Sequence, residues 1–225
     1  ARPGVCAADD AIMIRDASGT TTFLSGGMSG ASWQAWRDGE PPCVIGDVVV
    51  EARRRDGTLT DVDVRVGRPE PAAGAILGLV DGQQAVDYLL EAARRASSRD
   101  GRDLILAAAL AGDAVRWPGL LDLAKDRALP ERTRKAALHW LGREAAAEAA
   151  RELGGIVRDR TEADEIRDAA VFAISQLPDE QAVDMLIEVV RTVPDARIRG
   201  RALFWLAETE DPRALALFEE ILSRG

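Results

Sequence analysis

Hydrophobic positions recur at helical spacing over the second half of the chain, in a phrase that is repeated three times. Each copy begins with arginine and continues through small and large apolar residues. The copies occupy residues 134–141, 167–174 and 199–206. A period of about 30 to 35 residues is typical of supersecondary units that bury their apolar faces only by stacking on one another. The pattern therefore predicts a helical repeat protein.

A second apolar pattern with helical spacing follows each phrase. These patterns lie at 149–157, 182–190 and 214–222, and proline stands at or near the start of the last two, at Pro178 and Pro212. Proline is tolerated in the first turn of a helix, where its missing N–H has no partner in any case. Each unit is therefore predicted to be an antiparallel helical hairpin.

The same frame extends toward the N-terminus with lower fidelity. Residues 102–109 precede the first phrase by one period, and 117–124 follow them as a second helix. Residues 83–97 form an amphipathic stretch that would pack as an unpaired opening helix. Together these segments predict about nine helices.

The repeats resemble HEAT repeats, specifically the short bacterial type that is also found in phycobilin lyase subunits. That type combines an acid, Val/Ile-Arg-x-Ala-Ala-x-x-Ala-Leu-Gly and then Asp-Pro-x-Ala-Val/Leu. It is matched by 195–207 with 211–215, and by 165–175 with 179–183. The resemblance covers roughly residues 83–225 and implies an α-solenoid. Because the family includes scaffolds, bilin lyases and DNA-base glycosylases, the fold alone does not select a function.

The N-terminal part of the chain has a two-residue period instead. Residues 48–55 and 58–66 carry alternating β-branched residues around an Asp-Gly dipeptide that suits a type I′ turn. Residues 11–15 and 20–24 are predicted to form another strand pair. The chain is therefore expected to be mainly α, an α-solenoid of HEAT-like hairpins preceded by a small antiparallel β module.

Composition divides the chain into three segments. The β module is predicted at 1–70, a linker at 71–82 and the solenoid at 83–225. With 47% hydrophobic and 30% charged residues, the 225-residue chain has ample material for a core. Its apolar runs are far shorter than a membrane span, so no transmembrane segment is expected.

Segment 25–47 is rich in Gly, Ser and Pro, and its sequence predicts neither a helix nor a strand. It contains Trp33 and Trp36. Long ordered loops often carry function, so both tryptophans are candidate residues of a partner surface.

Both cysteines, Cys6 and Cys43, fall in the predicted β module. A small module buries little apolar surface, and a disulfide closing a loop of this size would stabilise it by roughly 3 to 4 kcal/mol. A disulfide predicts an extracytoplasmic location, periplasmic or secreted. The alternative is a pair of unpaired buried thiols in a cytosolic protein. The chain begins at Ala1, as it would after removal of a targeting segment or at the boundary of a longer protein.

The net charge of -9 disfavours nucleic-acid partners, because an acidic chain repels phosphate backbones. The run Arg53-Arg54-Arg55 is an exception to this acidic character. On an alternating hairpin these arginines point to different faces, and Asp61 and Asp63 lie on the partner strand. The run is therefore predicted to be a solvated, paired edge.

The chain has one histidine, His139, so a metal site with two imidazole ligands cannot be built. We expect no catalytic residue, no metal and no cofactor. His139 occupies the repeat position that Phe172 and Phe204 fill in the next two units. Equivalent residues of stacked repeats lie in a row about 10 Å apart, so these three would form a partly exposed stripe and a candidate partner surface. The alternative is that the rings pack against neighbouring helices.

The arginine that opens each phrase recurs beside an acid of the preceding turn. The arginines are Arg134, Arg167 and Arg199, and the acids are Glu131, Asp164 and Asp195. We expect a ladder of near-surface ion pairs, each contributing about 0 to 1 kcal/mol and setting the register of the repeats.

Two functions remain. The first is a non-enzymatic, exported bacterial scaffold that binds protein partners as an accessory subunit of a larger, membrane-associated complex. The second is a ligand-binding or lyase-like accessory subunit that uses the inner face formed by the second helices. That face is expected to carry Asp184, Glu188, Arg191, Glu219 and Glu220. The second function would require a pocket with convergent polar groups there.

Overall fold

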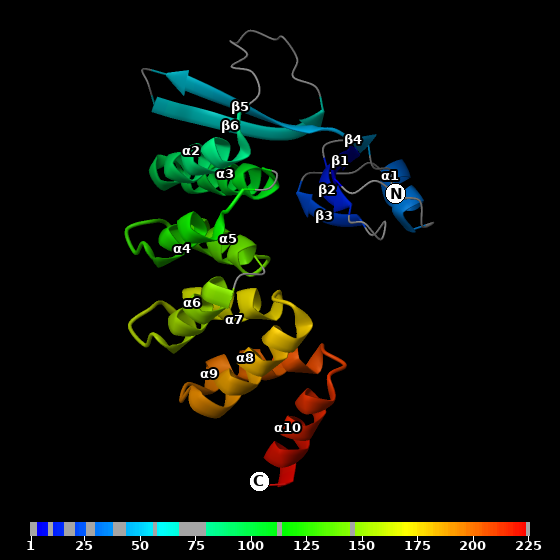
Figure 1. Ribbon diagram of the computed structural model, residues 1–225, viewed down its shortest axis with the longest axis vertical. Coiled ribbons are helices and arrows are strands. Elements are labelled where there is room, and N and C mark those ends of the chain that lie inside the picture. The colour runs from blue at the N-terminus through cyan, green and yellow to red at the C-terminus, as the bar shows by residue number, and fades with distance from the viewer. Residues whose placement is uncertain are drawn as a thin grey trace. The chain divides into compact units, whose positions relative to one another are not determined.

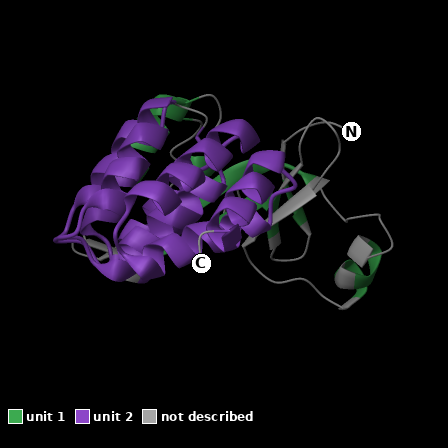
Figure 2. Ribbon diagram, turned by 90° about the horizontal axis from the view of Figure 1, so that it is seen from below, with its two compact units in different colours: residues 1–89, 106–114 green, residues 90–105, 115–225 purple. Residues whose placement is uncertain are grey.

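The computed structural model describes residues 4–8, 11–15, 21–25, 30–37, 44–55, 58–67, 80–111, 114–144 and 147–223. The chain forms two compact units, which Figure 2 shows in different colours. One unit comprises residues 1–89 and 106–114, and the other comprises 90–105 and 115–225. The structure confirms a mainly helical solenoid that follows a small antiparallel β module along the chain.

The first unit contains a four-stranded antiparallel sheet in the order β3-β2-β1-β4. Its strands are β1 (Gly4–Ala8), β2 (Ala11–Arg15), β3 (Thr21–Ser25) and β4 (Val44–Ile45). The pairing of β2 with β3 confirms the predicted strand pair. Strand β1 was not predicted because its sequence, Gly-Val-Cys-Ala-Ala, does not alternate between apolar and polar residues, and β4 has only two residues.

The predicted hairpin is present as β5 (Asp47–Arg55) and β6 (Thr58–Gly67). Arg53 pairs with Asp61 at 2.9 Å across the two strands, and Arg65 pairs with Glu51 at 2.6 Å. Arg53 therefore lies on an exposed, paired strand, as the alternation predicted. The turn between the strands lies outside the described residues.

Segment 25–47 contains a helix, α1 (Gly30–Arg37), where the sequence predicted no element. Eight residues make barely two helical turns, too short for a helical period to be recognised. Trp33 and Trp36 lie on α1, but their side chains are outside the described part of the structure, so their role in a partner surface stays a prediction. Cys6 on β1 is fully buried. Cys43 also lies outside the described residues, so the disulfide stays a prediction too.

Helices α2 (Gly82–Arg95) and α3 (Ser98–Leu110) each contribute residues to both units. The division between the units therefore runs through these helices. The predicted linker at 71–82 lies mostly outside the described residues, and the domain boundary proposed there remains a prediction.

Seven further helices build the second unit and follow one another as successive layers in Figure 1. They are α4 (Trp117–Lys125), α5 (Glu131–Leu141), α6 (Ala147–Arg158), α7 (Asp164–Ser175), α8 (Asp179–Thr192), α9 (Ala196–Ala207) and α10 (Pro212–Ser223). The first helices α5, α7 and α9 pack on one another in order, and the second helices α4, α6, α8 and α10 do the same. The described residues from 80 onward thus contain nine helices, as the repeats predicted.

The repeat positions that carry an apolar residue in each copy of the phrase form the core of the second unit. They are fully buried at Ala137, Ala170, Ala202, Leu141, Ile174 and Leu206. Helix α5 ends at Leu141 and is capped by Gly142, where a Cβ would lie 2.3 Å from the carbonyl oxygen of Ala173 on α7. Only glycine permits this approach of the two helices. Among the described residues, no helix is both long and apolar enough to cross a membrane.

Candidate functional site

Aromatic rings from α5, α7 and α9 form a contiguous cluster on the second unit. His139 stacks on Phe172 with ring centroids 5.8 Å apart and planes at 13°. Phe172 in turn contacts Trp205, at 5.2 Å, and Trp205 meets Phe204 edge-on at 5.0 Å. We call His139, Phe172, Phe204 and Trp205 the aromatic cluster.

The cluster combines the two arrangements that the sequence left open. His139 and Phe172 are half-buried and lie side by side, which corresponds to packing between neighbouring helices. Phe204 keeps 50% of its surface exposed. Phe172 contacts the ring of Trp205, the residue after Phe204. The series of ring contacts across the helices therefore passes through Trp205 on α9. Whether this cluster binds a partner remains a prediction.

The environment of His139 favours the neutral form of its ring. Burial lowers its pKa below the ordinary value, and the positive charge of Arg143 lowers it further. Arg143 lies over the neighbouring Trp140 ring, at 5.6 Å from the centroid. A neutral imidazole stacks on a phenyl ring without desolvating a charge, which fits a packing role. Within the described part of the chain, no three His, Cys, Asp or Glu residues are grouped so as to hold a metal ion.

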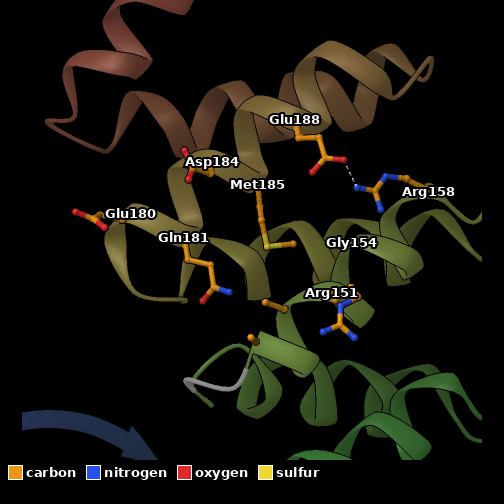
Figure 3. Close-up of a pocket in the computed structure, with 10 residues that line it drawn as sticks. Arg151, Gly154, Arg158, Glu180, Gln181, Asp184, Met185 and Glu188 are labelled. Carbon is orange, nitrogen blue, oxygen red and sulfur yellow. Dashed lines mark hydrogen bonds and ion pairs between the residues drawn. The ribbon is translucent and has the colours of Figure 1, made fainter.

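An open polar groove lies on the second-helix layer between α6 and α8 (Figure 3). Its volume is about 610 Å³. Ala150 and Gly154 line it from α6, and Gln181 and Met185 extend toward them from α8. The layer thus contains an open groove on the face where the second predicted function places its ligand.

Charged residues of the second-helix layer pair across successive repeats. The pairs are Lys125 with Glu152 at 3.0 Å, Arg158 with Glu188 at 2.5 Å, Arg191 with Glu220 at 3.0 Å and Arg213 with Asp184 at 2.6 Å. Four of the five residues expected on the inner face therefore take part in ion pairs that align the repeats. These charges are satisfied within the chain, which leaves fewer of them for a ligand.

The phrase-opening arginines differ from the predicted near-surface ladder. Arg134 is only 5% exposed, and its Nε donates to the carbonyl oxygen of Ala124 at 2.8 Å. Its two Nη atoms bind both carboxylate oxygens of Glu162 in the next repeat, at 3.0 and 2.5 Å. The expected acid, Glu131, pairs with Lys135 instead, at 2.5 Å. The prediction of a near-surface ladder was wrong for Arg134 because its guanidinium is buried, where the carbonyl oxygen of Ala124 and the carboxylate of Glu162 accept its hydrogen bonds.

Arg127 lies beside the ion pair of Arg134 and Glu162. It pairs with Asp159 at 2.9 Å and lies 3.6 Å from Glu162. Hydrogen bonding to Arg134 lowers the pKa of Glu162 below its ordinary value. We call Arg127, Arg134, Asp159 and Glu162 the Arg134 joint. It contains two arginines and two carboxylates.

Arg167 occupies the same place one repeat later and is 4% exposed. Its Nε donates to the carbonyl oxygen of Val157 at 3.0 Å, and its Nη1 donates to Asp195 at 2.7 Å. Its contact with Asp164, the acid that the sequence proposed, is longer, at 3.4 Å. Nη2 is buried and has no hydrogen-bond partner among the described residues. A buried donor without an acceptor costs about 1 to 3 kcal/mol.

Asp195 explains the missing bond. Its Oδ1 accepts from the backbone N–H groups of Arg197 and Ile198 and so caps α9, which leaves Oδ2 for Arg167. Hydrogen bonding to Arg167 lowers the pKa of Asp195. Glu162, which is one methylene longer, can bind Arg134 with both oxygens.

The sequence interpretation missed Arg160 and Thr192 beside Arg167. Arg127 pairs with Asp159, which lies 32 residues further along the chain. Arg160 occupies the position of Arg127 one repeat later, and the residue 32 positions after it is Thr192. The signal was available as a departure from the repeat, an acid replaced by a threonine. We call Arg160, Arg167, Thr192 and Asp195 the Arg167 joint.

A family model for HEAT repeats matches residues 159–225, which include α7 to α10. This segment is therefore similar to HEAT repeats, as its sequence predicted, and such repeats commonly serve as protein-interaction scaffolds. The bacterial origin and the phycobilin-lyase type remain predictions. No curated protein matches the chain significantly.

Proposed function

We propose that the chain is a protein-interaction scaffold without catalytic activity, exported by a bacterium as an accessory subunit of a larger, membrane-associated complex. The observation that carries the interaction role is the aromatic cluster, which crosses three helices and ends at the half-exposed Phe204. Because Trp205 holds the Phe204 ring, a partner could bury that ring at little cost in side-chain entropy. The net charge of -9 favours a protein over a nucleic acid as that partner.

Phe204→Ser tests this role. Tagged wild-type protein and the variant are used in parallel to recover partners from membrane extracts of the native host. We expect a defined partner that copurifies with the wild type and is reduced at least about tenfold with the variant, since an aromatic anchor contributes 2 kcal/mol or more. Thermal unfolding should change little, because half of the ring is already exposed.

Leu215→Ser is the matched control, since Leu215 on α10 is 61% exposed and should leave the partner bound. Phe172→Ser should instead destabilise the fold, because that ring contacts both His139 and Trp205. Undiminished recovery of the same partner by Phe204→Ser would remove the cluster as the interface.

Export is supported by the place of Cys6. It is fully buried on β1, and its register partner on β4 is Ile45, two residues after Cys43 in the chain. Two residues reach at most about 7 Å, so the sequence allows Cys43 to approach Cys6. We expect mass spectrometry of the alkylated, unreduced protein to show one cross-link and no labelled thiol. Two labelled thiols would contradict both the disulfide and the extracytoplasmic location.

A second candidate function is a ligand-binding or lyase-like accessory subunit. The groove of Figure 3 favours it, because its volume of about 610 Å³ is that of a small-molecule site. Ligand sites usually combine apolar walls with a few convergent polar groups. Here the acids Asp184 and Glu188 are held by Arg213 and Arg158, which is why the scaffold is preferred.

A further inference from the structure

The two joints contain arginines at equivalent repeat positions but differ at the position of the first acid. The Arg134 joint places Asp159 against Arg127 and Glu162 against Arg134. In the Arg167 joint Thr192 stands where the first acid would be, and Asp195 takes the place of Glu162. Asp164 also lies 3.4 Å from Arg167, but it is 3.3 Å from Arg197 as well. Arg160 makes no ion pair within the part of the chain that the structure describes. The Arg167 joint therefore lacks the carboxylate that Asp159 supplies in the preceding repeat.

A cavity occupies the position where that carboxylate is lacking. It has a volume of about 350 Å³ and is lined by Arg158, Arg160, Arg167, Glu188 and residues 192–194. Arg167 is itself more than nine-tenths buried, and its Nη2 has no acceptor among the described residues. A buried guanidinium with an open donor, lining a cavity beside an unpaired arginine, forms a site for an anion.

We propose that the Arg167 joint binds a single carboxylate supplied from outside the chain, with Arg160 and Arg167 as its donors. Thr192 leaves room for it. The bound group takes the place that Asp159 holds in the preceding repeat, and it completes the same balance of two arginines and two carboxylates. The carboxylate belongs to an acidic side chain or a chain terminus of a protein partner.

The charges around the cavity favour a carboxylate over a phosphate. Arg158 is already paired with Glu188, and Arg167 is paired with Asp195 and lies near Asp164. Arg160 is left as one uncompensated positive charge among these groups. A monoanion neutralises it, whereas a phosphate dianion adds a second negative charge close to Asp195 and Glu188.

Acetate is the probe that tests this site. Wild-type protein is titrated at constant ionic strength, with chloride as the replaced anion, and the Arg Nε–H and backbone signals of residues 190–195 are followed by NMR. We expect a saturable shift at these residues with acetate and a weaker response to phosphate. Arg160→Ala, an exposed substitution, should weaken acetate binding at least about tenfold by removing one charged donor.

Two matched variants exchange the residues at which the joints differ, and they should exchange the response to acetate as well. Thr192→Asp supplies the carboxylate from within the chain and should abolish the acetate response. Asp159→Thr removes the equivalent acid and should create a response at the Arg134 joint. Acetyl-glutamate amide and acetyl-glycine then distinguish a side-chain carboxylate from a terminal one, since each carries only one of these.

No saturable response in the wild type would overturn the proposal. So would a response that persists unchanged in Thr192→Asp, or phosphate binding that exceeds acetate binding. None of these measurements involves the aromatic cluster. The carboxylate site and the proposed partner surface can therefore fail independently.

Discussion

The Arg134 joint and the Arg167 joint are built by the same repeated phrase, yet only one is saturated. In the first, a guanidinium is held by both oxygens of Glu162 and by the carbonyl of Ala124. In the second, the guanidinium is held by the carbonyl of Val157, by one oxygen of Asp195, whose other oxygen caps α9, and by a longer contact with Asp164. The comparison teaches that the repeat specifies where a buried arginine stands, whereas single departures from the repeat decide whether it has an open donor.

The largest expected effect separates Arg134→Ala from Arg167→Ala. Removing Arg134 leaves Glu162, whose side chain is 8% exposed, without its bidentate partner. Loss of one partner of a buried ion pair typically costs about 3 to 5 kcal/mol. Removing Arg167 should cost less, about 1 to 3 kcal/mol, because Asp195 is 31% exposed and still caps α9. Denaturant unfolding of both variants measures the difference.

Arg134→Lys and Arg167→Lys serve as paired controls, because lysine keeps the charge but loses the planar fork. Lysine should be the poorer substitute at position 134, where both Nη atoms are used. Equal losses of unfolding free energy for the two alanine variants would show that the joints are equivalent and would break the comparison.

A smaller effect is expected in the pH dependence of stability. The pKa of Glu162 is lowered mainly by its hydrogen bond from Arg134, and that of Asp195 mainly by its hydrogen bond from Arg167. A carboxyl whose pKa is lower in the folded state stabilises the fold above its unfolded pKa of about 4, and that stability is lost as the pH falls through the folded pKa.

The gap in unfolding free energy between wild type and Arg134→Ala should therefore be constant from pH 6 to 7 and narrow below about pH 4. Arg167→Ala should show the same sign with a smaller change, since Asp195 is more exposed than Glu162. Denaturant titrations over this range measure both gaps. A gap that widens on acidification would mean that the arginines do not stabilise ionised carboxylates.

Much of the helical architecture could be predicted from the sequence, because buried columns such as Ala137 and Leu141 recur in every copy. The hairpin of β5 and β6 was equally readable, since its alternation continues over two long strands. Strand β1 was missed because its residues do not alternate between apolar and polar, and helix α1 because eight residues are too few for a helical period to be recognised. Their formation depends on neighbours that sequence periodicity does not report.

The candidate sites were predicted less completely. The sequence selected His139, Phe172 and Phe204 by their shared repeat position, but it could not show that Trp205 would become the ring next to Phe172. It also treated the arginines as surface residues, because charge pairing along the chain gives no measure of burial. Thr192 departs from the repeat in the sequence itself, but the meaning of that departure for Arg160 follows from the contacts across repeats.

Arg199 closes the series of phrase-opening arginines and has consequences for how the second unit comes apart. In the described part of the chain it donates to the carbonyl oxygens of Val193 and Pro194, both in the turn just before its own helix. Arg134 and Arg167 instead bind an acid of the following repeat. Arg199 therefore makes no bond to a further repeat in the described part of the chain, where the hairpin of α9 and α10 packs on a neighbouring repeat through α7 and α8 alone. We expect this hairpin to open locally at a lower free energy than α5 to α8, which pack on repeats at both sides.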